Sequence, residues 1–322
     1  MSSSTLHNLA YKYFYSPNLL CKFIYIVLSP ISLIYAFLVW IKFILSKPQI
    51  YQIPIISVGN LILGGTGKTP LIKAIFNKFS EQYSVFIVLR GYKRKSKGLL
   101  VVCDKGEIKC TVDESGDEAM EYALSLKNAN IIVSENRKIA IQKAINLGAN
   151  LILLDDGFGK FNIFKFNILL QPPKKPALNL TIPSGVYRYP KSFYKFGDFI
   201  PENSDIIKTS YIQNKSEKML LVSAIANPFR LYEFEKICVN SVFFPDHYDF
   251  KKSELEQILN QHNATSLLVT QKDYVKIKDF GLPLSIIILD TKISSNFAQI
   301  LENFIKNYNK FAKIHAKKEK SC

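Results

Sequence analysis

The fold is decided by the stretch Gly59-Asn60-Leu61-Ile62-Leu63-Gly64-Gly65-Thr66-Gly67-Lys68-Thr69. The apolar run 55–58 before it predicts a short buried strand, and apolar residues recur at helical spacing over 71–79. A strand, a glycine-rich turn and a helix opening on Gly-Lys-Thr form the context of a phosphate-binding loop, because backbone N–H groups and the positive helix end converge there. We expect Lys68 to reach the β- and γ-phosphates of a nucleotide and the Thr69 hydroxyl to bind Mg²⁺.

One position departs from the usual loop pattern. A glycine normally stands five residues before the Gly-Lys pair, and Ile62 occupies that place. Gly64 and Gly65 lie deeper in the loop and are expected to supply the turn instead. The predicted nucleotide-binding set is Ile62, Leu63, Gly64, Gly65, Thr66, Gly67, Lys68 and Thr69. The competing interpretation is an ordinary glycine-rich turn ahead of a helix.

Composition limits the class of partner. The 322 residues are 48% hydrophobic, enough for a buried core, and carry a net charge of +16. Such an excess of positive charge implies an anionic partner. No DNA- or RNA-reading motif is present, so no nucleic acid is expected, and a membrane surface or phosphorylated substrates are favoured. The cysteines are scattered, without a Cys-x-x-Cys pair, so neither a zinc site nor a disulfide framework is expected.

An uncharged run of 19 residues, Phe23 to Ile41, predicts a membrane-associated helix within residues 1–50. As a helix it would be about 28 Å long, close to the thickness of the bilayer hydrocarbon. Lys22 and Lys42 flank the run and are able to reach headgroups. Spanning the membrane and lying in its interface both stay open. The rest of the chain is basic and is expected on the cytoplasmic side. The competing interpretation of the uncharged run is a buried or surface helix of a soluble protein.

A second apolar run that ends in carboxylates predicts a metal-binding strand end. Residues 151–154 are followed by Asp155 and Asp156, the shape of a Walker B element. Such a strand places an acid beside the phosphate loop, where it holds Mg²⁺ or its water. The competing interpretation, a strand followed by an Asp-Gly turn, is expected to describe one of the two aspartates.

Other charged residues stand at positions that suit a site but carry less information alone. Arg90 follows the apolar run 85–89 and therefore lies at the carboxyl end of a predicted strand. Asp117 and Glu118 open a predicted helix, where acids also serve as capping and dipole partners. His247 follows Asp246 in a loop and is a candidate general base or its orienter, although a surface histidine is the commoner case.

Buried runs alternate with helical patterns along the chain, which predicts an α/β fold. The expected architecture is a P-loop NTPase-like, doubly wound, mostly parallel sheet. The kinase core is expected over 51–213, a smaller C-terminal α/β domain over 214–322, and the N-terminal membrane-associated helix over 1–50. The last amphipathic pattern, 294–314, predicts one long helix.

In their order along nearly the whole chain, these motifs resemble the tetraacyldisaccharide 4'-kinase family, the lipid A 4'-kinases of Gram-negative bacteria. That family also lacks the early loop glycine. Besides the loop, the matching stretches are Arg90-Gly91-Tyr92, Gly116-Asp117-Glu118, Leu154-Asp155-Asp156-Gly157-Phe158, Ile182-Pro183-Ser184-Gly185 with Arg188, Asn227-Pro228, Phe244-Pro245-Asp246-His247 and Thr270-Gln271-Lys272-Asp273.

The resemblance implies transfer of the γ-phosphate of ATP to the 4'-hydroxyl of a tetraacyldisaccharide 1-phosphate. It implies an Asp117–His247 dyad for the acceptor hydroxyl, with the two halves of the chain closing over the substrate. Lys68 would stabilise transition-state charge.

The same resemblance suggests the remaining ligands. Mg²⁺ would be held by Thr69 and Asp155, completed by Asp156 or Glu118, and the phosphates of substrate or nucleotide by Arg90 and Arg188. The enzyme would work on the anionic cytoplasmic face of the inner membrane.

Three departures from the family pattern leave a reduced activity open. The usual Gln-His after Asp-Asp-Gly-Phe is Gly159-Lys160, the usual second histidine after Asp-His is Tyr248, and the usual acid before Lys272 is Gln271. Three other classes remain alternatives: a membrane-targeted ATPase of the partitioning type, a GTP-dependent switch, and an anchored protein without enzymatic activity. Leu63 in place of a lysine counts against the first, and the missing guanine-reading order counts against the second.

Overall fold

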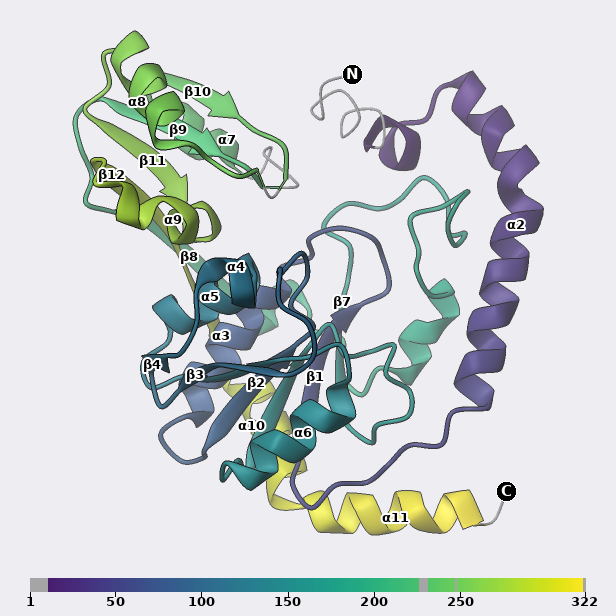
Figure 1. Ribbon diagram of the computed structural model, residues 1–322. Coiled ribbons are helices and arrows are strands. Elements are labelled where there is room, and N and C mark those ends of the chain that lie inside the picture. Colours follow the sequence, from purple (N-terminus) through teal and green to yellow (C-terminus); the bar gives the residue numbers. More distant parts are fainter. Residues whose placement is uncertain (1–10, 226–230, 247, 321–322) are drawn as a thin grey trace.

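The computed structural model describes residues 11–225, 231–246 and 248–320, with side chains to residue 315. It contains two sheets, one in each of two lobes (Figure 1). The first sheet consists of β1 (Ile55–Asn60), β2 (Val85–Leu89), β3 (Leu100–Asp104), β4 (Glu107–Ile108), β5 (Asn130–Val133), β6 (Leu151–Asp155) and β7 (Phe166–Leu170). The second consists of β8 (Ile206–Gln213), β9 (Met219–Ser223), β10 (Asn240–Phe243), β11 (Ser266–Thr270) and β12 (Leu284–Ile293).

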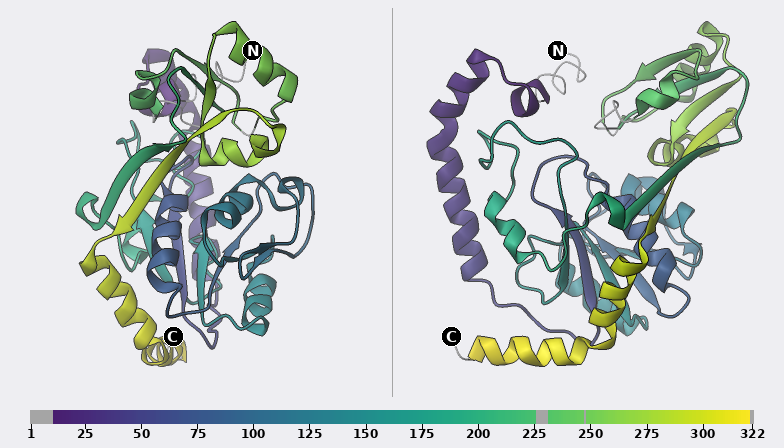
Figure 2. Two further views of the ribbon diagram at one scale, coloured as in Figure 1. Left: turned by 90° about the vertical axis from the view of Figure 1, so that its left-hand side faces the viewer. Right: turned by 180° about the vertical axis from the view of Figure 1, so that it is seen from behind.

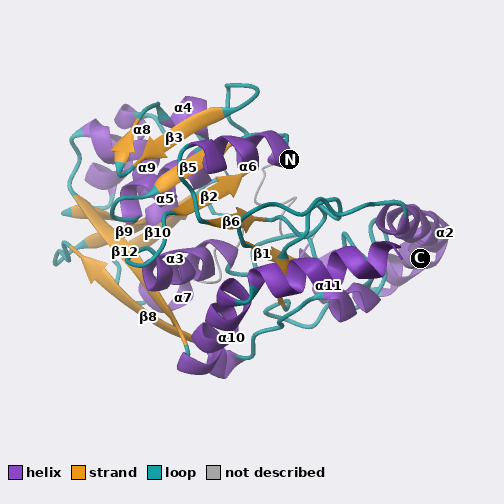
Figure 3. Ribbon diagram, turned by 90° about the horizontal axis from the view of Figure 1, so that it is seen from below, coloured by secondary structure: helices purple, strands orange, loops and turns teal. Residues whose placement is uncertain are grey.

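The first sheet has the strand order β4-β3-β5-β2-β6-β1-β7. β5, β2, β6, β1 and β7 run parallel, whereas β3 pairs antiparallel with β5 and β4 antiparallel with β3. The parallel strands are continuous apolar runs because both faces of the sheet are covered. Helices α3 (Lys68–Phe79), α5 (Asp117–Ser125) and α10 (Ser295–Lys306) cover one face, and α6 (Arg137–Asn146) covers the other (Figure 3). The expected doubly wound, mostly parallel α/β sheet is confirmed.

One expected helix gains a short helical turn before it, and another is divided in two. The helix that Asp117 and Glu118 were expected to open is α5, which begins at Asp117, and the short helix α4 (Val112–Ser115) precedes it, separated from it by Gly116. Gly116 has φ +85°, and a Cβ on it would lie 3.0 Å from the Tyr92 carbonyl oxygen, so both backbone and space demand glycine. The helix expected over 294–314 is α10 and α11 (Tyr308–Lys320), and it breaks at Asn307.

The second lobe has the strand order β10-β9-β11-β12-β8, with only β8 antiparallel. Its helices are α7 (Tyr232–Glu235), α8 (Lys252–Gln261) and α9 (Gln271–Ile277). The paired strands β8 and β12 form the ribbon that leads from one lobe to the other (Figure 2). Two elements lie across the expected domain boundary at 213/214: β8 belongs to the second sheet, and α10 packs on the first.

The N-terminal helix α2 (Leu19–Ile44) stands apart along one side of the first lobe (Figure 1). By length and composition it suffices to cross a membrane, and most of its surface is exposed. One narrow stripe is buried, and Ser32 in that stripe contacts the loop that follows β7. The Ser32 hydroxyl accepts from the Ser184 N–H at 2.9 Å, and its carbonyl accepts from the Thr181 hydroxyl at 2.6 Å. The apolar helix is therefore joined to the core by specific polar contacts.

Candidate active site

The glycine-rich loop leads from β1 directly into α3. Gly67 takes the left-handed conformation, with φ +91°, and α3 begins at Lys68. Asn60, the last residue of β1, braces the loop from within: its side-chain amide donates to the Gly64 carbonyl at 3.2 Å and to the Thr66 hydroxyl at 3.1 Å. The predicted strand, turn and helix are therefore present in the order that a phosphate cradle needs.

Ile62 and Leu63, the first two residues of the predicted nucleotide-binding set, are paired with the segment around Tyr187 instead of lining the cavity. The Ile62 side chain is 1% exposed and packs in a hydrophobic cluster with Phe158 and Phe193. The Ile62 backbone forms an isolated antiparallel bridge with Tyr187. The N–H of the following residue, Leu63, donates to the Val186 carbonyl at 2.9 Å. An isoleucine fits the early glycine position because the chain is extended and paired there.

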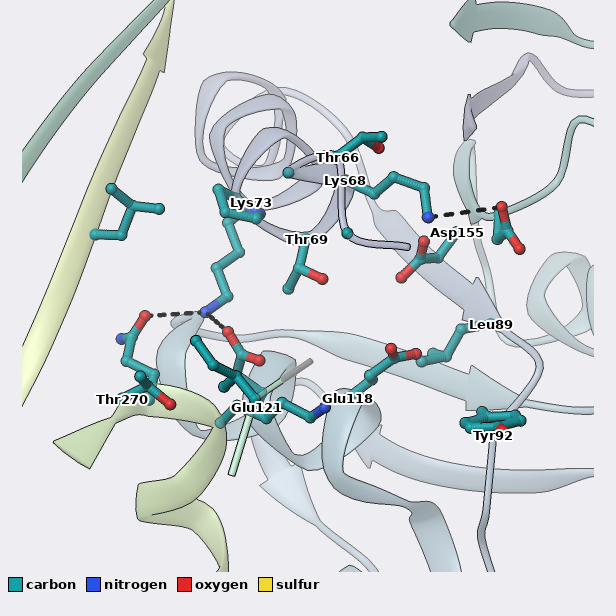
Figure 4. A pocket seen from close by; sticks show the side chains of 18 of the residues that line it. Thr66, Lys68, Thr69, Lys73, Leu89, Tyr92, Glu118, Glu121, Asp155 and Thr270 are labelled. Carbon is teal, nitrogen blue, oxygen red and sulfur yellow. Dashed lines mark hydrogen bonds and ion pairs between the residues drawn. The ribbon is translucent and has the colours of Figure 1, made fainter. Parts of the chain in front are cut away.

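A cavity of about 620 Å³ opens between the lobes in front of the loop (Figure 4). The loop contributes residues 65–69, and the carboxyl ends of β2 and β6 contribute Arg90 and the two aspartates 155 and 156. The opposite wall comes from the second lobe. It is largely apolar and includes Ile225, Leu231, Phe234, Ile287 and Leu289. The predicted residues Glu118 and Arg188 also line this cavity.

Asp156 is held by two cations. Arg188 donates to both carboxylate oxygens, at 2.8 and 2.9 Å, and Lys68 Nζ lies 3.7 Å from Oδ1. Burial works to raise the pKa of Asp156, but the Arg188 hydrogen bonds and the Lys68 charge outweigh it and lower that pKa to about 2. Because Arg188 occupies both oxygens, a role of Asp156 as a metal ligand requires this pair to open, and that role stays a prediction.

Asp155 points into a buried polar cluster beside the loop. The Tyr122 hydroxyl, fully buried, donates to Asp155 Oδ2 at 3.0 Å and is hydrogen-bonded to Thr69. Burial raises the pKa of Asp155. Burial and the Asp155 charge together raise the pKa of Glu118 to about 7. Both carboxyl groups are thus disfavoured in their ionised form, and a cation bound between them would stabilise the two negative charges.

The residues fit Mg²⁺ by their chemistry. Thr69, Glu118 and Asp155 surround the same part of the cavity (Figure 4), and all offer the oxygen ligands that Mg²⁺ prefers. Within the described ranges, no group of three or more His, Cys, Asp and Glu is arranged to hold a metal by itself. A Mg²⁺ site that is completed by nucleotide phosphates and water needs only one or two carboxylates from the protein.

Arg137 is a site residue that the sequence did not reveal. Arg137 is 3% exposed and lines the cavity, and its guanidinium donates to the backbone carbonyls of Ser134 at 2.7 Å and Asp155 at 3.0 Å. Burial lowers its pKa to about 10, with the two aspartates 155 and 156 opposing that shift. An arginine in the first turn of a helix gives no signal of its own, although its place after strand β5 would have been a reason to consider it.

Asp117 lies at the contact between α5 and α9, where the two lobes meet. Its Oδ2 is 3.0 Å from Lys276 Nζ, and the same Nζ donates to the Tyr248 carbonyl at 3.0 Å. Asp246 pairs with a second lysine of α9, one turn before Lys276: Lys272 Nζ lies 2.9 Å from Asp246 Oδ1. His247, the other half of the predicted dyad, lies outside the described residues.

The departures from the family pattern have local structural counterparts. Gln271 accepts from Lys73 Nζ at 3.2 Å, while Lys73 also pairs with Glu121 at 2.7 Å, so the amide keeps a contact that a carboxylate would make. A Cβ on Gly159 would lie 2.0 Å from the Tyr189 hydroxyl oxygen. The Tyr248 hydroxyl donates to Glu254 at 3.1 Å.

Comparison with known proteins assigns the family. The model of the tetraacyldisaccharide-1-phosphate 4'-kinase family matches residues 24–213 and 201–309. The chain is 48% identical over 297 residues to the tetraacyldisaccharide 4'-kinase of Campylobacter jejuni, covering 92% of this chain and 95% of that protein. It is 44% identical over 306 residues to that of Helicobacter acinonychis, covering 94% and 97%.

A solved structure has the same fold. The "apo" form LpxK from Aquifex aeolicus in complex with ATP superposes with a TM-score of 0.74 at 24% identity, covering 88% of this chain and 99% of that one. The family match and the curated relatives each span most of the chain. The chain therefore belongs to the tetraacyldisaccharide-1-phosphate 4'-kinase family.

Proposed function

We propose that this chain transfers the γ-phosphate of ATP to the 4'-hydroxyl of a tetraacyldisaccharide 1-phosphate and so makes the bis-phosphorylated lipid A precursor. Membership of the 4'-kinase family supports the reaction class. The observation that carries the proposal is the position of Lys68: it opens α3 behind a left-handed Gly67 and faces Asp156 at 3.7 Å across the cavity. A cation at a helix start beside carboxylates is the arrangement that phosphoryl transfer uses.

The chain's own groups then divide the work. Lys68 and the α3 amides hold the β- and γ-phosphates and stabilise the charge that develops on them. A bound Mg²⁺, held by Thr69 and Asp155 with Glu118, would neutralise phosphate charge. Arg90 and Arg188 bind phosphates of the nucleotide or of the acceptor. Non-polar side chains of the second lobe exclude water from the cavity.

Activation of the acceptor is assigned to Asp117 and His247. We propose that Asp117 accepts the proton of the 4'-hydroxyl and that His247 tunes it. The contact of Lys276 with both Asp117 and the Tyr248 carbonyl supports this, because it links the acid of the first lobe to the neighbour of His247 in the second.

The place of the reaction is proposed from α2 and from charge. The exposed apolar surface of α2 suits the lipid phase, and the net charge of +16 suits an anionic leaflet. A lipid substrate is met most readily where its headgroup lies, so the cytoplasmic face of the inner membrane is the proposed location.

A single assay tests the function. The full chain in mixed micelles receives ATP, Mg²⁺ and purified tetraacyldisaccharide 1-phosphate, and the product is scored for a second phosphate. We expect transfer by the wild type and a loss of about 100-fold or more for Lys68→Ala. The proposal fails if the wild type hydrolyses ATP without phosphorylating the lipid, which would favour a membrane-associated ATPase.

A further inference from the structure

Helix α9 carries the polar contacts by which the second lobe meets α5 of the first. The helix is held firmly in its own lobe by Asp273, whose side chain is fully buried. That carboxylate accepts from the Ser223 hydroxyl at 2.7 Å, the Thr270 hydroxyl at 2.8 Å and the Ala224 N–H at 3.1 Å. The backbone of α9, from which Lys272 and Lys276 extend, is therefore fixed within its lobe.

Lys276 of α9 lies within this contact. Its Nζ lies 3.0 Å from Asp117 Oδ2 and 3.0 Å from the Tyr248 carbonyl oxygen, and it stands 5.9 Å from the centre of the Phe250 ring. The two charged side chains are 9% and 15% exposed, so their pairing is shielded from solvent. One ammonium thus joins α5, α9 and the segment that follows His247.

The alternative partners around Asp117 are also charged. Lys272, one turn earlier on α9, is an electrostatic neighbour of both Asp117 and Glu118, and it is hydrogen-bonded to Asp246. Glu118 faces the cavity from the next position of α5. Besides its contact with Asp117, Lys276 donates to the backbone carbonyl of Tyr248, so its position depends on that of the chain itself.

We infer that Lys276 is a positioning residue: it sets the Asp117 carboxylate at the place where the acceptor hydroxyl is deprotonated, and it does so only when the two lobes are in contact. The inference rests on the proposed function. A carboxylate at the first position of a helix has several staggered orientations, and an ammonium at 3.0 Å selects one of them. A displacement of about 1 Å in such a group costs on the order of 100-fold in rate.

The experiment separates this role from general support of the lobe contact. Initial rates of lipid phosphorylation are measured for the wild type, Lys276→Met, Lys276→Arg, Asp117→Asn and the double variant Asp117→Asn with Lys276→Met. Lys278→Met is the matched control, because Lys278 lies two residues away and pairs with its exposed neighbour Asp279. Thermal unfolding of each variant shows that it is folded.

We expect Lys276→Met to lower kcat about 100-fold while KM for ATP and for lipid stays within about twofold. Lys276→Arg should recover most of that loss, and Lys278→Met should behave as the wild type. In the Asp117→Asn background the Lys276→Met change should cost less than about twofold, because its target is gone.

Three results overturn the inference. A Lys276→Met enzyme with unchanged kcat leaves the lysine without a role in the reaction. A rise in KM with kcat unchanged assigns it to closure of the lobes alone. If Lys276→Met lowers kcat by the same factor in the Asp117→Asn background as in the wild type, Lys276 acts through a group other than Asp117. An inactive wild type removes the proposed function and this inference with it, and so differs from the first three outcomes.

Discussion

The guanidinium of Arg188 and the carboxylate of Asp156 form a two-pronged ion pair, with nitrogen–oxygen distances of 2.8 and 2.9 Å. The same guanidinium donates to Asn60 Oδ1 at 2.6 Å and to the Ile62 carbonyl at 3.1 Å. Arg188 therefore ties the end of β6 to the phosphate loop, using the fork geometry that lysine lacks.

Replacement of Arg188 by lysine should keep the charge and lose the fork. We expect the free energy of unfolding to fall by about 2 kcal/mol, mainly through the bonds to Asn60 and Ile62, and kcat/KM for ATP to fall by about tenfold or more. Urea unfolding and steady-state kinetics measure the two effects. A lysine variant as stable and as active as the wild type would show that charge alone suffices.

Loss of the Ser32 hydroxyl should loosen α2 from the core. Ser32→Ala leaves the buried Ser184 N–H without its partner, which costs about 1–3 kcal/mol locally. Hydrogen exchange of the Ser184 amide in detergent should become faster by the corresponding factor. Ser29→Ala is the control, since the Ser29 hydroxyl donates within α2, to the Ile26 carbonyl, and exchange at Ser184 should not change.

A side chain at position 159 should clash with Tyr189. The Cβ of Gly159→Ala would lie 2.0 Å from the Tyr189 hydroxyl oxygen, and that ring is packed edge-on against Phe158. We expect a loss of about 1–3 kcal/mol in the free energy of unfolding. In a Tyr189→Ala background the same change should cost less than about 0.5 kcal/mol. Equal costs in both backgrounds would locate the strain elsewhere.

Lys165 should make stability depend on pH. Burial lowers its pKa to about 7, although the Asp198 charge opposes the shift. Between about pH 7 and the ordinary lysine pKa of about 10.4, the unfolded chain binds a proton that the folded chain has released, so stability rises with pH there. In that window, the free energy of unfolding of the wild type should rise relative to that of Lys165→Met by up to about 1.4 kcal/mol per pH unit.

Denaturant unfolding from pH 6 to pH 10 measures this difference. Lys191→Met, which replaces an exposed lysine by the same residue, is measured beside it as the matched control. A difference for Lys165→Met that stays constant with pH would show that Lys165 Nζ, which donates to the Lys160 carbonyl at 2.7 Å, keeps an ordinary affinity for its proton despite its burial.

The loop and the strand ends were predictable because each has a local signal. Gly67-Lys68 at the start of α3 and Asp155 at the end of β6 are read from short stretches, and the structure places both at one cavity. β8 was missed for the opposite reason. Most of its residues are exposed, and its pairing with β12, more than 70 residues later, is what makes it a strand.

Contacts between distant segments account for the remaining omissions. Tyr122 and Arg137 are ordinary helical residues until β6 places Asp155 beside them. The core position of Phe297, on α10 against the first sheet, has no local signature that distinguishes it from packing in the second lobe. The chemical roles of Asp117, His247, Arg90 and the metal-binding carboxylates stay predictions.

The pairing of β8 with β12 makes the second lobe an insertion in the first. Ile206 faces Ile293 across the ribbon, and just outside it the Ser294 N–H donates to the Asp205 carbonyl at 2.9 Å. The chain thus leaves and re-enters the nucleotide-binding core at adjacent points. The apolar wall of the cavity and Lys276 are therefore both carried by one segment, inserted between two adjacent points of the core.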